Sequence, residues 1–289
     1  MITIENGRNR WFIAAGTAAV GAVTAAALFA VTGTADAASG SAASAASADR
    51  APKPTVILEH GAFADASSWD GVLTDLRHDG YPVIAAANPL RGPASDATSL
   101  RSVIEHVKGP VILVGHSYGG SVISEAAVGE ANVKALVYVA AFLPAPGESA
   151  LQLTGLFPGS TLPATLDPVP FTNPDGSTGT DLYIQQDKFP HQFAADVPAD
   201  QAALMAETQR PIAQAALEEK ATVAAWKTIP SWDVVTTQDL NIPPAAQEFM
   251  AKRAGSRSQV VRGASHMVFV SEPGTTVAFI KKAARETAR

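Results

Sequence analysis

The sequence has 289 residues, no cysteine and a formal net charge of −6. The lack of cysteine excludes disulfide bonds and thiol chemistry. Acidic and basic residues are interspersed without a run of Lys or Arg, so nucleic acid and anionic membrane surfaces are not expected as partners.

The N-terminal part has the composition of an export signal rather than of a folded core. Two arginines precede a long apolar run at residues 11–31, and Ala35-Asp36-Ala37 matches a signal-peptidase site. We therefore predict a signal peptide over residues 1–37, cleaved near Ala37, and a secreted protein with no stable membrane association after cleavage. An uncleaved membrane anchor is the alternative, because the run is longer than usual. The Ala- and Ser-rich residues 38–53 are predicted to be a flexible linker.

The next part of the chain, residues 54–143, alternates short apolar strands with amphipathic helices. Strands are expected at residues 55–58, 81–86, 111–114 and 135–140. The same rhythm returns over residues 230–289, with strands at 232–235 and 259–261. This alternation predicts the α/β class, with a mostly parallel sheet and helices on both faces.

Residues 144–229 interrupt this rhythm. Residues 167–181 are dense in Pro, Gly, Asn and Asp and are expected to be a loop, whereas residues 198–208 and 212–220 are expected to be helices. An insertion of this length predicts a cap or lid, largely helical, over the sheet. Its apolar side chains either line a substrate pocket or form a small core of the cap itself.

Gly115-His116-Ser117-Tyr118-Gly119 follows the third strand directly and fits G-x-S-x-G, the nucleophile elbow. The two glycines allow the close backbone approach of a sharp turn. The serine then lies at a helix N-terminus, where amide groups and the dipole favour negative charge. Ser117 is therefore the candidate nucleophile. A glycine-rich turn with an incidental serine is the alternative.

A serine hydroxyl needs an adjacent base and, beyond it, a carboxylate that orients the base. Of the two histidines after Ser117, His191 lies in the insertion, whereas His266 follows the last strand at the sheet edge where the elbow also lies. Asp239 follows the preceding strand and completes the chain order Ser, Asp, His that this motif shows. We predict a triad of Ser117, His266 and Asp239. Glu148 is the alternative acid.

An oxyanion intermediate needs two backbone N–H donors. We assign one to Tyr118 and the other to Ala62, with Phe63 as second choice, in the loop after the first strand. His60 is interpreted as a residue that holds this loop by hydrogen bonds, and no role is assigned to Glu59. The remaining histidines lack metal-ligand spacing, so neither a metal nor an organic cofactor is expected.

His60-Gly61-Ala62-Phe63, the elbow with Gly120, and Gly263-Ala264-Ser265-His266-Met267 together resemble the α/β-hydrolase superfamily across residues 55–283. The resemblance is greatest to the branch of plant methylesterases, hydroxynitrile lyases and secreted bacterial esterases. It implies the α/β-hydrolase fold and ester hydrolysis through an acyl-serine intermediate. Gly61 and Met267 match the esterase pattern, since the lyases carry threonine and lysine there. Thr236 departs from the glycine that relatives usually carry before the acid loop.

We therefore expect a secreted serine hydrolase that cleaves carboxylic esters of small to medium apolar molecules. A lactonase, an acyltransferase or a cofactor-free haloperoxidase would use the same triad. A ligand-binding protein of low turnover on the same scaffold is a further alternative. The expected partner is a small-molecule ester, and the sequence does not define an oligomeric state.

Overall fold

The computed structural model describes residues 52–288. The predicted signal peptide and most of the predicted linker lie outside these residues. Among residues 52–288, no helix combines the length and the apolar character needed to cross a membrane.

A sheet of six parallel strands forms the centre of the fold, in the order β2-β1-β3-β4-β8-β9. The strands are β1 Thr55–Glu59, β2 Val83–Ala86, β3 Val111–His116, β4 Val133–Val139, β8 Ser231–Thr236 and β9 Arg257–Val261. Every residue of β3 and of β8 is buried, as expected for central strands of a parallel sheet that is covered on both faces. The six predicted strands are thus confirmed, with ends shifted by at most a few residues.

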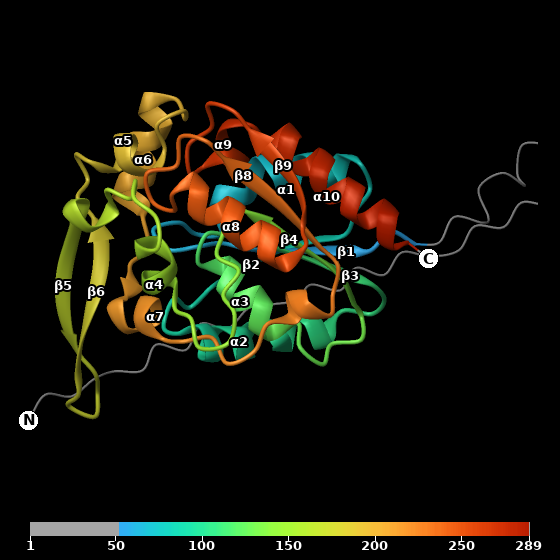
Figure 1. The fold of residues 1–289 in the computed structure, drawn as a ribbon, viewed down its shortest axis with the longest axis horizontal. Coiled ribbons are helices and arrows are strands. Elements are labelled where there is room, and N and C mark those ends of the chain that lie inside the picture. The colour runs from blue at the N-terminus through green and yellow to red at the C-terminus, as the bar shows by residue number, and fades with distance from the viewer. Residues whose placement is uncertain (1–51, 289) are drawn as a thin grey trace, which may run out of the picture. The chain divides into compact units, whose positions relative to one another are not determined.

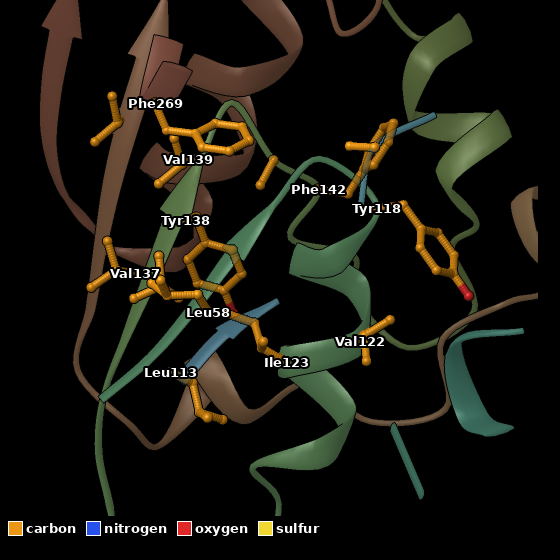
Figure 2. Close-up of a cluster of buried hydrophobic side chains, with 14 of the residues drawn as sticks. Leu58, Leu113, Tyr118, Val122, Ile123, Val137, Tyr138, Val139, Phe142 and Phe269 are labelled. Carbon is orange, nitrogen blue, oxygen red and sulfur yellow. The ribbon is translucent and has the colours of Figure 1, made fainter. Parts of the chain in front are cut away.

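Helices cover both faces of this sheet (Figure 1). On one side α1 packs against α9 and α10, and on the other α2 packs against α3. The helices of the core are η1 Ala66–Trp69, α1 Asp70–His78, α2 Pro93–His106, α3 Gly119–Ala126, α8 Pro244–Ala254, α9 Val268–Ser271 and α10 Pro273–Thr287. Figure 2 shows Ile123 on the side of α3 that faces Leu58 and Leu113 of the sheet, within the buried apolar core.

The segment between β4 and β8 is mixed rather than largely helical, which corrects the expectation from sequence. Its three-stranded sheet has the order β5-β6-β7 and is antiparallel. The elements of the segment are α4 Ala150–Gly155, η2 Leu162–Thr165, β5 Leu166–Thr172, β6 Thr178–Ile184, α5 Phe189–Phe193, α6 Ala199–Thr208, β7 Ile212–Ala213, α7 Gln214–Glu218 and η3 Ala225–Lys227.

Two local predictions in this segment were therefore wrong. Residues 167–181, expected to be a loop, form most of the β5–β6 hairpin, and only the turn around Gly176 (φ 85°) is irregular. Pro168 and Pro170 fit in β5 because it is an edge strand, where a missing N–H need not cost a ladder hydrogen bond. The helix expected at residues 212–220 is shortened to α7, since its first two residues pair with β6 as β7. The helix at residues 198–208 is confirmed as α6.

Candidate active site

Ser117 stands in a sharp turn between β3 and α3. Its φ of 53° lies in the left-handed region, which is unusual for a residue with a side chain. A Cβ at Gly115 would lie 2.7 Å from the carbonyl oxygen of Gly119, and one at Gly119 would lie 2.6 Å from that of Glu59. The Ser117 carbonyl accepts hydrogen bonds from the N–H groups of Gly120 (3.0 Å) and Phe142 (3.1 Å). The glycines and these contacts hold the strained turn that the motif predicts.

His266 lies in the turn after β9, and its imidazole meets Asp239. His266 Nδ1 donates to Asp239 Oδ2 at 2.6 Å, and both side chains are buried. Asp239 Oδ1 also accepts from the N–H groups of Asn241 (2.7 Å) and Ile242 (3.0 Å), while Gln247 Nε2 donates to Oδ2 at 2.8 Å. The carboxylate is therefore held by several donors, and it fixes the tautomer of His266 with the proton on Nδ1.

Thr236, which departs from the pattern of relatives, belongs to the surroundings of this carboxylate. Its hydroxyl lies 3.4 Å from Asp239 Oδ2, and Gln247 Oε1 accepts a hydrogen bond of 3.0 Å from its N–H. The residue is fully buried at the end of β8. A threonine here is thus compatible with an ordered acid loop.

Ser117 and His266 line one cavity with Ala62, Phe63 and Tyr118. The structure therefore brings to one cavity five residues that the sequence predicts for the site, with Asp239 behind His266. His266 Nε2 is buried and has no hydrogen-bond partner among residues 52–288. This nitrogen is the acceptor of the imidazole, so it is available to take a proton from a group in the cavity.

Two backbone amides of the cavity are unused. In the part of the chain that the structure describes, the N–H groups of Ala62 and Tyr118 donate no hydrogen bond, whereas that of Phe63 donates to the Arg210 carbonyl at 3.0 Å. Tyr118 directly follows Ser117, and the loop of Ala62 touches the serine, since a Cβ at Gly61 would lie 2.6 Å from the Ser117 Cβ. The first two amides are therefore free for an oxyanion, and the amide of Phe63 is not.

Two buried histidines, His60 and His116, hydrogen-bond to the backbone of the loops that form the site. His60 Nδ1 donates to the Gly61 carbonyl (2.9 Å) and its Nε2 accepts from the Asn88 N–H (3.0 Å), so His60 holds the loop as the sequence predicts. Burial lowers the pKa of His60 to about 4, and burial also lowers the pKa of His116 well below its usual 6.5. Both rings are therefore neutral at pH 7.

His116 is a supporting residue that the sequence does not reveal. Its Nε2 donates to the carbonyl oxygen of His266 at 3.1 Å, and the two rings lie 4.6 Å apart between centroids. The one signal in the sequence is its position directly before Ser117, at a variable position of the motif. Its contact with residue 266 depends on the fold.

The alternative acid and base lie elsewhere. Glu148 forms a two-pronged ion pair with Arg253, at 2.6 and 2.8 Å, instead of contacting His266. His191 is exposed on α5. Glu59 is buried, and one of its carboxylate oxygens has no partner in the described structure. Burial and the nearby Asp96 raise the pKa of Glu59 well above its usual value.

The cavity is small, with a volume of about 60 Å³, and the rest of its wall is mainly apolar. The polar side chains in its wall are satisfied within the protein: Thr154 Oγ1 donates to the Ala150 carbonyl and Asn241 Nδ2 donates to the Gln192 carbonyl. Side chains of the inserted segment form much of the wall, namely Ala150, Leu151, Thr154, Leu162, Pro163, Leu166, Phe193 and Leu217. Such a cavity favours an uncharged, apolar group.

Comparison with solved structures shows the same fold in esterases. Polyneuridine aldehyde esterase superposes with a TM-score of 0.70 at 17% identity, over 80% of this chain and 98% of that one. A pyrethroid hydrolase from Sphingobium faniae JZ-2 gives a TM-score of 0.64 at 23% identity, over 81% and 98%. At these identities the likeness concerns the fold alone.

Comparison of sequences assigns the family. The chain is 29% identical over 255 residues to the alpha/beta hydrolase nvfD of Aspergillus novofumigatus (strain IBT 16806), covering 81% of this chain and 98% of that one. It is 25% identical over 235 residues to the putative methylesterase 11, chloroplastic, of Arabidopsis thaliana, covering 75% and 60%. The model of the alpha/beta hydrolase family matches residues 56–279. The chain therefore belongs to the alpha/beta hydrolase family.

Proposed function

We propose that the protein hydrolyses carboxylic esters of small to medium apolar molecules through an acyl-serine intermediate. The observation that carries the proposal is the shared cavity, which is lined by Ser117, by the Asp239-bound His266 with its unpartnered Nε2, and by Ala62 and Tyr118 with their unused amides. The esterase and hydrolase names of the similar proteins agree with this reaction class.

The reaction follows from the roles that these groups allow. Ser117 Oγ attacks the ester carbonyl carbon while His266 Nε2 takes the hydroxyl proton, and the Asp239 carboxylate stabilises the imidazolium. The N–H groups of Ala62 and Tyr118 bind the oxyanion. The C–O bond to the alcohol then breaks, and the alcohol leaves with the proton from His266. A water molecule repeats the cycle on the acyl-serine and releases the acid.

The apolar wall of the cavity supports the substrate class, since it offers no charged partner to an ester side group. Residues 144–229 supply much of this wall, so we assign them the role of a cap that selects substrates. A lactonase, an acyltransferase, a cofactor-free haloperoxidase and a ligand-binding protein of low turnover are the other outcomes of the substrate test.

The role proposed for the N-terminal residues is secretion. Residues 1–37 have the composition of a signal peptide, with Ala35 and Ala37 at the cleavage site. N-terminal sequencing of material from the culture medium should find a start near Ala38. A chain retained in the membrane with its first residues intact would favour the anchor instead.

The test of the reaction is a Ser117→Ala variant assayed on a chain-length series of nitrophenyl esters, with lactones in parallel. We expect turnover to fall by about 10³-fold or more, because the nucleophile is lost while binding remains. Labelling by a fluorophosphonate should disappear in the same variant. Ser102→Ala, on the exposed side of α2, is the control and should behave as wild type. Ester turnover unchanged in Ser117→Ala would overturn the assignment.

A further inference from the structure

A short stretch of the inserted segment, residues 192–196, contacts both loops that carry the acid and the base. Towards the acid loop, Gln192 Nε2 donates to the Leu240 carbonyl at 2.9 Å. Asn241 Nδ2, two residues after Asp239, donates in return to the Gln192 carbonyl at 3.1 Å. The stretch that precedes α6 is thus tied to the loop of Asp239.

Towards the base, Asp196 holds the residue that precedes His266. Its Oδ2 accepts from the Ser265 N–H at 3.0 Å, and its Oδ1 accepts from the Ser265 hydroxyl. The hydroxyl of Ser271, at the end of α9, donates to Oδ2 at 2.8 Å. One carboxylate therefore accepts three hydrogen bonds and joins Ser265, directly before His266, to Ser271 at the end of α9.

Further contacts link the residues on both sides of His266. Ser265 Oγ also accepts a hydrogen bond from the N–H of Met267 at 3.3 Å, so the two neighbours of His266 are linked through the side chain that Asp196 holds. Ser265 is buried, and the ring of Phe193 packs against the His266 ring with 4.9 Å between centroids.

The other contacts that order this turn come from the core. The Gln238 N–H donates to the Ala264 carbonyl at 3.0 Å, and His116 donates to the His266 carbonyl. Asp196 differs because it belongs to the inserted segment, which also lines the cavity. The hydrogen bonds of Asp196 therefore couple the position of the inserted segment to the position of His266.

We propose that Asp196 is a positioning residue for His266: its carboxylate clamps Ser265 and so holds the imidazole in the cavity that it shares with Ser117 through both proton transfers. This rests on the proposed function, since the alignment matters only if His266 serves as base. Reacting groups must be held to a fraction of an ångström, and a displacement of about 1 Å can cost about 100-fold in rate. The insertion then controls the rate of the chemical step as well as the choice of substrate.

The test compares Asp196→Ala with Asp187→Ala, which removes an exposed carboxylate of the same segment that pairs with Lys188. We expect kcat and the rate of fluorophosphonate labelling to fall by about 10- to 100-fold in Asp196→Ala, with KM within about threefold of wild type. Asp196→Asn should recover part of the loss, because its carbonyl oxygen still accepts from the Ser265 N–H. Asp187→Ala should match wild type.

A merely structural role would show as a loss of folded protein, so kcat is expressed per site titrated and thermal unfolding is recorded alongside. Equal kcat in the two alanine variants, or a loss that follows the unfolded fraction alone, would overturn the clamp. If wild-type protein neither turns over esters nor labels, the proposed function fails. In that case the positioning role fails with it, and hydrogen exchange of residues 262–271 tests only the structural part: equal exchange in all variants would show that Asp196 does not order the turn of His266.

Discussion

At Gly61 the loop after β1 lies directly against the elbow. A Cβ there would be 2.6 Å from the Ser117 Cβ and 2.8 Å from the His116 carbonyl oxygen, so the added atom can be accommodated only by a shift of backbone. The same loop carries the Ala62 N–H that we assign to the oxyanion. The lack of a side chain at residue 61 therefore allows the close approach between Ser117 and the loop of the proposed donor Ala62.

A Gly61→Ala variant should consequently lose kcat/KM by about 100-fold on nitrophenyl esters while its circular dichroism stays native. The cause is displacement of the donor loop from Ser117, since the variant removes no functional atom. Gly274→Ala is the matched control, because a Cβ at this exposed position of α10 meets nothing within 4 Å. Full activity in Gly61→Ala would show that the loop after β1 can move away from Ser117 while the Ala62 N–H still binds the oxyanion.

Chain order and strand ends indicate Ser117, Asp239 and His266 because parallel strands present their carboxyl ends at one edge of the sheet. The supporting contacts are of another kind. His116 and His266 are 150 residues apart, and Asp196 and Ser265 are 69 apart. No local pattern marks such pairs, since each depends on how two separate loops pack.

Among the elements, β5 shows how composition misleads. Its prolines and the turn at residues 173–177 look like a loop in sequence, because proline disfavours strands in general. The structure places this strand at the edge of a small sheet, where that argument does not apply. The six core strands were predictable because their apolar runs and the intervening amphipathic helices carry a local period. Whether a strand lies at the edge of a sheet depends on the strands that pair with it, so the local sequence does not indicate it.

The entry to the inserted segment is fastened by one ion pair between elements. Glu148 accepts two hydrogen bonds from Arg253 of α8 and a third, of 2.8 Å, from the Ala145 N–H. Arg253 also donates to the Leu143 carbonyl at 2.8 Å. Burial works to raise the pKa of Glu148, but the Arg253 guanidinium and the Ala145 N–H lower it on balance. The pair therefore stabilises the ionised form.

A Glu148→Gln variant should lower the free energy of unfolding at pH 7 by about 1–2 kcal/mol, because both charge-assisted bonds weaken. A lowered pKa means that this stabilisation is present above the unfolded value of 4.5 and is lost as pH falls through the folded pKa. Urea titrations at pH 7 and pH 3.5 should thus show the difference shrinking with acid. Asp187→Asn, in an exposed pair, should show no measurable change at either pH. A pH-independent difference would assign the loss to packing.

For the molecule as a whole, buried titratable groups act on stability in opposite directions. His60 and His116 are neutral when folded but take up protons when unfolded below pH 6.5, so their contribution falls with acid. Glu59 and Asp233 have raised pKa values, so they keep protons in the folded protein that the unfolded chain releases. Their contribution falls as pH rises. The histidine effect is complete above pH 6.5, whereas the effect of the two acids begins at their unfolded pKa values and continues up to their folded ones.

Asp233 is the residue at which the effect of a buried, protonated acid on stability can be measured alone. It is fully buried in β8, neither carboxylate oxygen has a partner among the described residues, and burial raises its pKa well above the usual 3.8. An Asp233→Asn variant keeps the shape but cannot ionise when unfolded.

Wild type should therefore lose about 1.4 kcal/mol of unfolding free energy per pH unit relative to Asp233→Asn. This relative loss begins at pH 3.8 and ends at the folded pKa of Asp233. Urea unfolding at pH 5, 6, 7 and 8 measures this slope, and subtracting the two curves cancels every other group. Asp200→Asn, on the exposed face of α6, should give a flat difference. Parallel curves for Asp233→Asn would mean that the carboxyl is ionised in the folded protein over this pH range, which would contradict the raised pKa.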